Sequence, residues 1–101
     1  MNTHKVVITS KAFADLQSCV SFVMNVSKEA AQKLQDNLFE SFKSLKTFPE
    51  KHPIFEMVKS FPLVVRKMIV DQRYIVLFSV KENEILVFRV LDVRRKFEGL
   101  L

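Results

Sequence analysis

Positive charge is concentrated in the last part of the chain, where an apolar strand pattern leads into three consecutive cations. Residues 85–101 read ILVFRVLDVRRKFEGLL. Alternate side chains of a strand point to opposite faces, so Arg89 is expected to face away from the core side. The expected core side is formed by Leu86, Phe88 and Val90, and the cations after the strand are Arg94, Arg95 and Lys96. Cations held at the edge of a rigid sheet are suited to bind an anion, such as a phosphate backbone or an acidic protein segment.

The excess of positive charge is unevenly distributed along the chain. The net charge is +5, and residues 59–101 hold nine Lys or Arg against five Asp or Glu. The first 58 residues hold seven against six, so four of the five excess charges lie in the second part. Surface cations are usually simply solvated, and on charge alone this interpretation is favoured over binding of an anionic partner.

Conventional catalytic motifs are missing from the sequence. The single glycine, Gly99, excludes glycine-rich phosphate loops and dinucleotide fingerprints. His4, His52 and Cys19 fall in three separate segments without metal-ligand spacing, so neither a metal site nor a cofactor is expected. We expect His52 to be a solvated loop histidine, and Cys19 to act as a small apolar side chain within a helix.

Length and composition indicate one compact domain over residues 1–101. Apolar residues make up 49% of the 101, enough to bury one core but not two. The apolar runs are far shorter than the ~20 residues that a membrane-spanning helix needs, and no signal peptide is evident. Together with a single cysteine, these features favour a cytoplasmic protein.

Two helices are expected in the first half of the chain, after a β-branched strand over residues 5–10. Ser10 is expected to cap the first helix and Ser27 the second, and Pro49 is expected to end the second. The expected apolar stripe of the first helix is Phe13, Leu16, Val20 and Val23, and that of the second is Ala31, Leu34, Leu38, Leu45 and Phe48. A connection this short predicts an antiparallel helical hairpin.

Three strands are expected in the second half, over residues 63–70, 74–80 and 85–91. Short polar connections between them predict hairpins. The order is therefore β-α-α-β-β-β, an α+β fold in which the helical hairpin covers one face of a small, mainly antiparallel sheet. The opposite face, apolar but carrying Arg89, is expected to be available for a partner.

Four segments in this order resemble the RelE/ParE superfamily of bacterial toxins from type II toxin-antitoxin systems. They are SKAFADL (10–16), SLKTFPEKHP (44–53), RKMIVDQRYIVLFSV (66–80) and ILVFRVLDVRRKF (85–97). The resemblance covers essentially the whole chain. It implies a small α+β toxin that inhibits bacterial growth and forms a hetero-oligomer with a cognate antitoxin.

The superfamily contains two mechanisms on one fold, so the resemblance leaves the target open. RelE-like members cut messenger RNA on the ribosome with cationic and aromatic side chains, whereas ParE-like members poison DNA gyrase. Arg66 and Arg94 match a lysine and an arginine of the RelE-like set, and both residue types can stabilise charge on phosphate. Ile75 and Met68 stand in place of a catalytic arginine and a second lysine.

Other positions also depart from the RelE-like pattern. Leu100 and Leu101 match no terminal tyrosine or histidine, and Arg73 or Tyr74 is the candidate substitute for a missing catalytic group. Because losing one such group typically costs ~10² in rate, the departures favour a ParE-like toxin that is not a nuclease. A RelE-like endoribonuclease is the alternative, and a basic RNA-binding module is a third interpretation.

Residues that could contact the antitoxin or the target are also implied by the resemblance. Antitoxins of this class resemble partly disordered acidic or amphipathic chains, which would meet cations and an exposed aromatic ring. The cationic candidates are Arg66, Arg89, Arg94, Arg95 and Lys96. Phe39 is the aromatic candidate, whereas Phe42 is expected to pack in the core.

Overall fold

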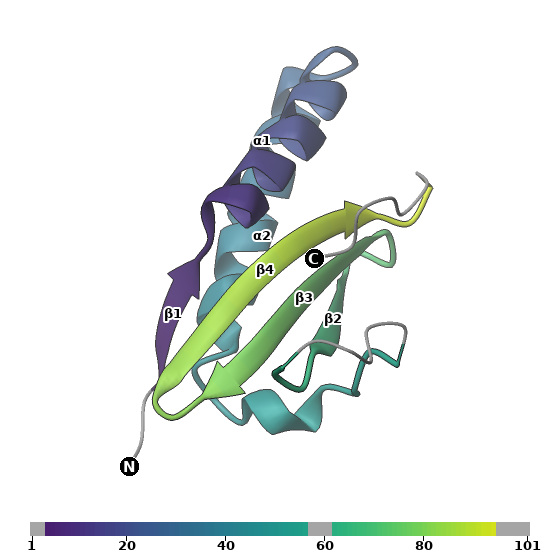
Figure 1. Cartoon of the computed structure of the whole chain (residues 1–101). Coiled ribbons are helices and arrows are strands. Elements are labelled where there is room, and N and C mark those ends of the chain that lie inside the picture. Colours follow the sequence, from purple (N-terminus) through teal and green to yellow (C-terminus); the bar gives the residue numbers. More distant parts are fainter. Residues whose placement is uncertain (1–3, 57–61, 95–101) are drawn as a thin grey trace.

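The computed structural model describes residues 4–56 and 62–94, in which two long helices lie against a sheet (Figure 1). The elements are β1 (Lys5–Ile8), α1 (Ser10–Met24), α2 (Lys28–Ser44), the 3₁₀ helix η1 (Pro49–Lys51), β2 (Arg66–Val70), β3 (Tyr74–Lys81) and β4 (Glu84–Asp92). The predicted order β-α-α-β-β-β and the α+β class are confirmed. None of the helices in these residues is long and apolar enough to cross a membrane.

The sheet has four strands in the order β1-β4-β3-β2. β2, β3 and β4 form an antiparallel meander, and β1 adds to the outer side of β4 in parallel. β1 pairs with only the first part of β4, from Glu84 to Val87. The remainder of β4 therefore needs other hydrogen-bond partners along that edge.

The helical hairpin buries its apolar stripe on one face of the sheet. The buried helical residues of this core are Ala12, Leu16, Cys19, Val20, Ala31, Leu34, Leu38 and Phe42. Two members of the predicted stripes are instead exposed, namely Phe13 and Phe48. Phe48 is 76% exposed because the second helix ends at Ser44, and the backbone at Phe48 adopts a left-handed conformation before Pro49. Pro49 therefore begins η1 and does not itself end α2.

Side-chain caps fix where both helices begin. The predicted cap of α2 is confirmed, since Ser27 Oγ accepts a hydrogen bond from the Ala30 N–H. The predicted cap of α1 is wrong by one residue. Thr9 Oγ1 accepts from the Ala12 N–H, and Ser10 is the first helical residue. The strand expected over residues 5–10 stops at Ile8 because Thr9 has this capping role.

A β-bulge in β4 changes which side chains face the helices. The register shifts between Leu77 and Phe78 of β3, which pair with Arg89 and Val87, so Phe88 is the extra residue. An extra residue reverses the alternation beyond it. The core-facing set is therefore Ile85, Val87 and Val90. The prediction is confirmed for Val90 and wrong for Leu86 and Phe88.

The second face of the sheet is partly covered, contrary to the expectation of an open face. Phe55 and Val65 pack there against Ile75, Leu77 and Leu91. The strand expected from Leu63 begins only at Arg66, because the carbonyl oxygens of Val64 and Val65 are bonded outside the sheet ladder. They accept from Ser79 Oγ at 2.7 Å and the Phe55 N–H at 2.7 Å.

Candidate functional site

Arg66, at the start of β2, holds the segment that follows η1. Its Nη1 donates to the carbonyl oxygens of Glu50 at 3.1 Å and His52 at 2.8 Å. Backbone carbonyl groups at a helix end need donors, and a guanidinium supplies several in a fixed geometry. Arg66 thus orders its own loop, a role that the sequence pattern did not indicate.

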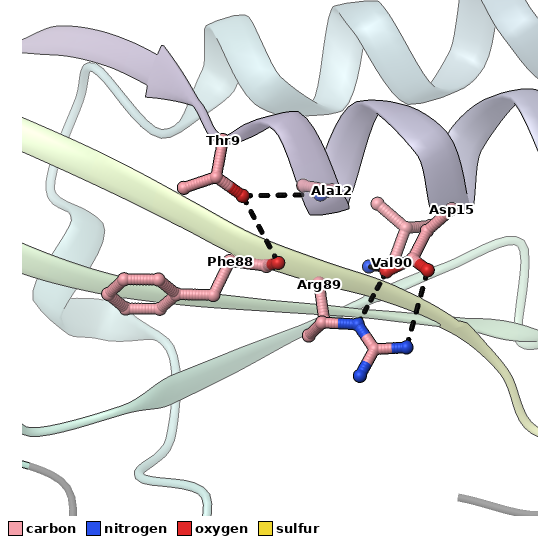
Figure 2. Close-up of polar contacts among 6 residues, drawn as sticks. All are labelled: Thr9, Ala12, Asp15, Phe88, Arg89 and Val90. Carbon is pink, nitrogen blue, oxygen red and sulfur yellow. Dashed lines mark hydrogen bonds and ion pairs between the residues drawn. The ribbon is translucent and has the colours of Figure 1, made fainter. Parts of the chain in front are cut away.

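Arg89 forms an ion pair with Asp15 of α1, as Figure 2 shows. Its Nε donates to Asp15 Oδ2 at 2.7 Å and its Nη2 to Oδ1 at 3.3 Å. The Val90 N–H also donates to Asp15 Oδ2, at 3.0 Å. Arg89 is only 9% exposed, so the expectation that it lies open for a partner is wrong.

The pair lies beside the part of β4 that β1 does not reach. There, residues of α1 and its N-cap supply hydrogen-bond partners in place of a strand. β1 ends at Ile8, and beyond it the Thr9 N–H donates to the Val87 carbonyl at 3.1 Å. Thr9 Oγ1 then donates to the Phe88 carbonyl at 3.3 Å (Figure 2). Together with Asp15, these contacts satisfy polar backbone groups of β4 that no strand covers.

Arg94, just after β4, is bound by the strand's last residue. Its Nε and Nη2 donate to Asp92 Oδ1 at 3.3 Å and Oδ2 at 3.2 Å, and its backbone N–H donates to Oδ1 at 3.0 Å. The guanidinium carbon also lies 5.9 Å from the ring centroid of Phe22 in α1. The Asp92 side chain is 4% exposed and that of Arg94 50%, so one side of the guanidinium still faces solvent.

Arg73 and Tyr74 lie at the turn between β2 and β3. The Arg73 guanidinium carbon is 5.5 Å from the ring centroid of Tyr74. Its Nε is buried and has no hydrogen-bond partner among the described residues. Burial raises the pKa of the Tyr74 phenol, while the positive charge of Arg73 partly opposes this change.

His52 is not the solvated loop residue that the sequence suggests. Its ring makes an edge contact with Phe78, with centroids 5.7 Å apart, and its Nε2 is buried without a partner in the described part of the chain. Burial, and then the positive charges of Lys51 and Arg66, lower the pKa of His52. A weakly basic imidazole packed on the core is a structural side chain.

The remaining candidates fall into two groups. Phe42 is buried in the core as expected, and Phe39 is partly buried with its ring 6.0 Å from that of Phe42 in a T-shaped contact. Phe39 therefore packs against the core as well as reaching the surface. Arg95 and Lys96, and the terminal positions Leu100 and Leu101, lie outside the described residues.

Three of the candidate residues, Arg73, Tyr74 and Arg94, lie together at one end of the sheet. Tyr74 pairs with Asp92, which holds Arg94, and the Val93 N–H donates to the Arg73 carbonyl at 2.9 Å. Arg66 pairs with Phe78, four residues along β3 from Tyr74. At about 3.3 Å per residue, Arg66 lies about 13 Å along the strand from this cluster.

Comparison with solved structures identifies the fold class. The chain is similar to a protein described as "Chromosomal ParDE TA system from P. aeruginosa", with a TM-score of 0.72 and 24% identity. The match covers 89% of this chain and 96% of that one. A search of curated proteins gives no match.

The family assignment rests on a match between this sequence and the model of one protein family. Residues 6–97 match the model described as "ParE toxin of type II toxin-antitoxin system, parDE". Since the match covers most of the sequence, the chain belongs to the ParE toxin family, within the RelE/ParE superfamily. It is a type II toxin of a toxin-antitoxin system.

Proposed function

We propose that this toxin stops bacterial growth by inhibiting DNA gyrase without cutting RNA, and that a cognate antitoxin neutralises it in the cytoplasm. Family membership supports the choice of target. The observation that carries the proposal is the burial of Ile75 and Met68. These residues stand where RelE-like toxins carry catalytic cations, and here they are apolar and packed in the fold.

Cleavage of RNA would need a base, an acid and a group that stabilises negative charge, all within reach of one phosphate. The cations matched to the RelE-like set are Arg66 and Arg94. Arg66 is bonded to two carbonyl groups and Arg94 to a carboxylate, and their positions are separated by four residues along β3, about 13 Å. His52 packs edge-on against Phe78 and its Nε2 is buried, so it is poorly placed as a base.

The antitoxin is proposed to cover the end of the molecule around Arg94 and the exposed part of α1. Exposed apolar side chains there include Phe22 and Val93, and the Arg94 guanidinium stacks beside Phe22. Apolar anchors and a cation next to each other suit an acidic, amphipathic segment that folds on binding. Arg95 and Lys96, which follow Arg94 in the sequence, are proposed to add positive charge to antitoxin binding.

The gyrase proposal is tested with the purified toxin in two assays run in parallel. We expect inhibition of DNA supercoiling by gyrase and no cleavage of messenger RNA on translating ribosomes. In growing cells, the same toxin is expected to cause filamentation and a DNA-damage response with intact messages. Codon-linked cuts in ribosome-bound RNA, with gyrase unaffected, would overturn the proposal in favour of the RelE-like mechanism.

A variant at Arg66 sharpens the choice of mechanism. Under the gyrase proposal Arg66→Gln affects only the loop that Arg66 holds, so the variant should lose thermal stability and keep its inhibition of gyrase. A nuclease that used Arg66 on phosphate would lose about 10² in cleavage rate with the fold intact. Lys81→Gln, at an exposed position in the β3–β4 hairpin, is the control for loss of one positive charge.

The neutralising partner is tested by co-expression. We expect a short neighbouring reading frame that encodes a DNA-binding half and an acidic half, and its product should restore growth and co-purify with the toxin. If no neighbouring product restores growth or binds, the antitoxin part of the proposal is wrong.

A further inference from the structure

A groove runs between the helical hairpin and the turn that joins β2 to β3. It has a volume of about 380 Å³, within the range of small ligand sites. Its lining consists of Val23, Ala30, Lys33, Leu34, Asn37, Asp71, Arg73 and Tyr74. Apolar and charged groups thus meet in one concave site that the gyrase proposal does not use.

Arg73 is the residue that makes this groove suited to bind an anion. Arg89 and Arg94 each have a carboxylate partner, and Arg66 has two carbonyl partners. Arg73 has no carboxylate within salt-bridge distance in residues 4–56 and 62–94, and its buried Nε lacks an acceptor there. Because Arg73 lines the groove and its positive charge has no carboxylate partner among these residues, an anion entering the groove would be stabilised.

The other polar groups restrict which anion fits. Asp71 accepts a hydrogen bond from Asn37 Nδ2 at 3.2 Å, which holds a negative charge at the groove. That charge disfavours a phosphate chain, and Tyr74 is only 3% exposed, so its ring cannot serve as a base-stacking platform. A single carboxylate, whose charge Arg73 and Lys33 can neutralise, is better matched.

Val23, Ala30 and Leu34 supply an apolar wall beside these cations. An aliphatic side chain placed there would be removed from water, and the volume is sufficient for about two side chains. We propose that the groove binds an acidic side chain and a neighbouring aliphatic side chain of a protein partner, with Arg73 as the main carboxylate ligand and Lys33 as the second. In the context of the proposed function, this partner is the antitoxin.

The groove contains its own spectroscopic reporter. Tyr74 is the chain's single tyrosine, and the chain has no tryptophan. Tyrosine emission of the intact protein therefore reports the groove without a label, and NMR shifts of the surrounding amides confirm the location. The probes are the capped peptide acetyl-Leu-Glu-Leu-amide, its uncharged analogue acetyl-Leu-Gln-Leu-amide and inorganic phosphate.

The glutamate peptide is expected to bind about tenfold more tightly than the glutamine peptide, as one charge-assisted hydrogen bond implies. Arg73→Gln should abolish this difference. Lys33→Gln, on the exposed side of α2, should reduce it without affecting folding. Lys81→Gln, a cation remote from the groove lining, should leave it unchanged. Thermal unfolding of each variant checks that the fold is retained.

Three results would overturn the proposal. The first is equal binding of the two peptides, and the second is displacement of the glutamate peptide by phosphate at similar concentration. The third is that Lys81→Gln and Arg73→Gln reduce the preference for the glutamate peptide equally. The second result would indicate a general anion site. Because the peptide assay contains neither gyrase nor antitoxin, its outcome is separate from that of the supercoiling assay.

Discussion

Two regions of this toxin use arginine in opposite ways. At the edge of β4, Arg89 lies against Asp15 with a 2.7 Å contact, and the pair closes the gap left where β1 ends. At the β2–β3 turn, Arg73 lies beside Tyr74 and has no carboxylate partner among the described residues. The difference shows that a cation supports the fold when its acceptor is internal, and is suited to recognition when that acceptor is missing.

The largest effect is expected from breaking the internal pair. Asp15→Ala leaves Arg89 largely buried without its carboxylate and the Val90 N–H without its acceptor. The free energy of unfolding should fall by about 3 kcal/mol, as for other buried pairs that lose one partner. Urea unfolding followed by circular dichroism measures this change.

The matched control is the exposed pair of Glu40 and Lys43 on α2, whose side chains are 74% and 69% exposed. Glu40→Ala should change the free energy of unfolding by less than about 0.5 kcal/mol. If both alanine variants lost the same amount, Asp15 would not have the special role assigned to it.

A smaller effect is expected at Arg94, which stands between the two extremes. It has a carboxylate partner in Asp92, but half of its side chain is exposed. Arg94→Gln should lower the free energy of unfolding by about 1 kcal/mol, because Asp92 stays buried and keeps only the backbone N–H donor. It should also weaken antitoxin binding, measured by calorimetry, if this cation belongs to the proposed surface.

Arg94→Lys separates the two roles of Arg94. Lysine keeps the charge but cannot make the paired contact with Asp92. We expect it to retain more antitoxin affinity than Arg94→Gln while losing a similar part of the stability. Unchanged antitoxin affinity in both variants would show that Arg94 contributes to stability and not to antitoxin binding.

The element order could be predicted from the sequence because it depends on local periodicity. The predicted burial of Phe13 and Phe48 is wrong because both lie near a helix end. There, the apolar stripe no longer decides which side chains are buried. The β4 faces could not be predicted, since counting alternate residues assumes an uninterrupted strand and the bulge at Phe88 breaks the count. A sheet register is required to locate such a bulge.

The roles of the arginines were hidden for a different reason. Asp15 is 74 residues from Arg89 in sequence, and nothing near Asp15 marks it as a partner for β4. Asn37 and Asp71 are 34 residues apart. The residue types suggested cations suited to an anion, but only the tertiary contacts show that Arg89 and Arg94 bind the internal carboxylates of Asp15 and Asp92.

The pH dependence of stability tests the environment of His52, a residue that packs on Phe78 and does not line the groove. Burial and the charges of Lys51 and Arg66 lower the pKa of His52 in the folded protein below its ordinary value of 6.5. The unfolded chain therefore binds the proton more readily. The stability contributed by His52 is complete above pH 6.5 and is lost as the pH falls from 6.5 toward the folded pKa.

Urea unfolding of the wild type at pH 7.5 and pH 5.5 measures this loss, and His52→Gln isolates it. The difference between the two proteins in free energy of unfolding should change with pH in the direction given above. A difference that is independent of pH over this range would show that the imidazole is equally basic in both states.

The finest test concerns Tyr74, whose ionisation reports the charges around the groove. Its phenol should titrate above its ordinary pKa of 10.0, because burial dominates over the opposing charge of Arg73. Arg73→Gln should raise the pKa of Tyr74 further, since the nearby positive charge that favours phenolate is lost. Asp71→Asn should lower it, because the Asp71 carboxylate raises the pKa. Ultraviolet absorbance of this single tyrosine gives all three values, and shifts of equal sign in the two variants would contradict the charge arrangement on which the groove depends.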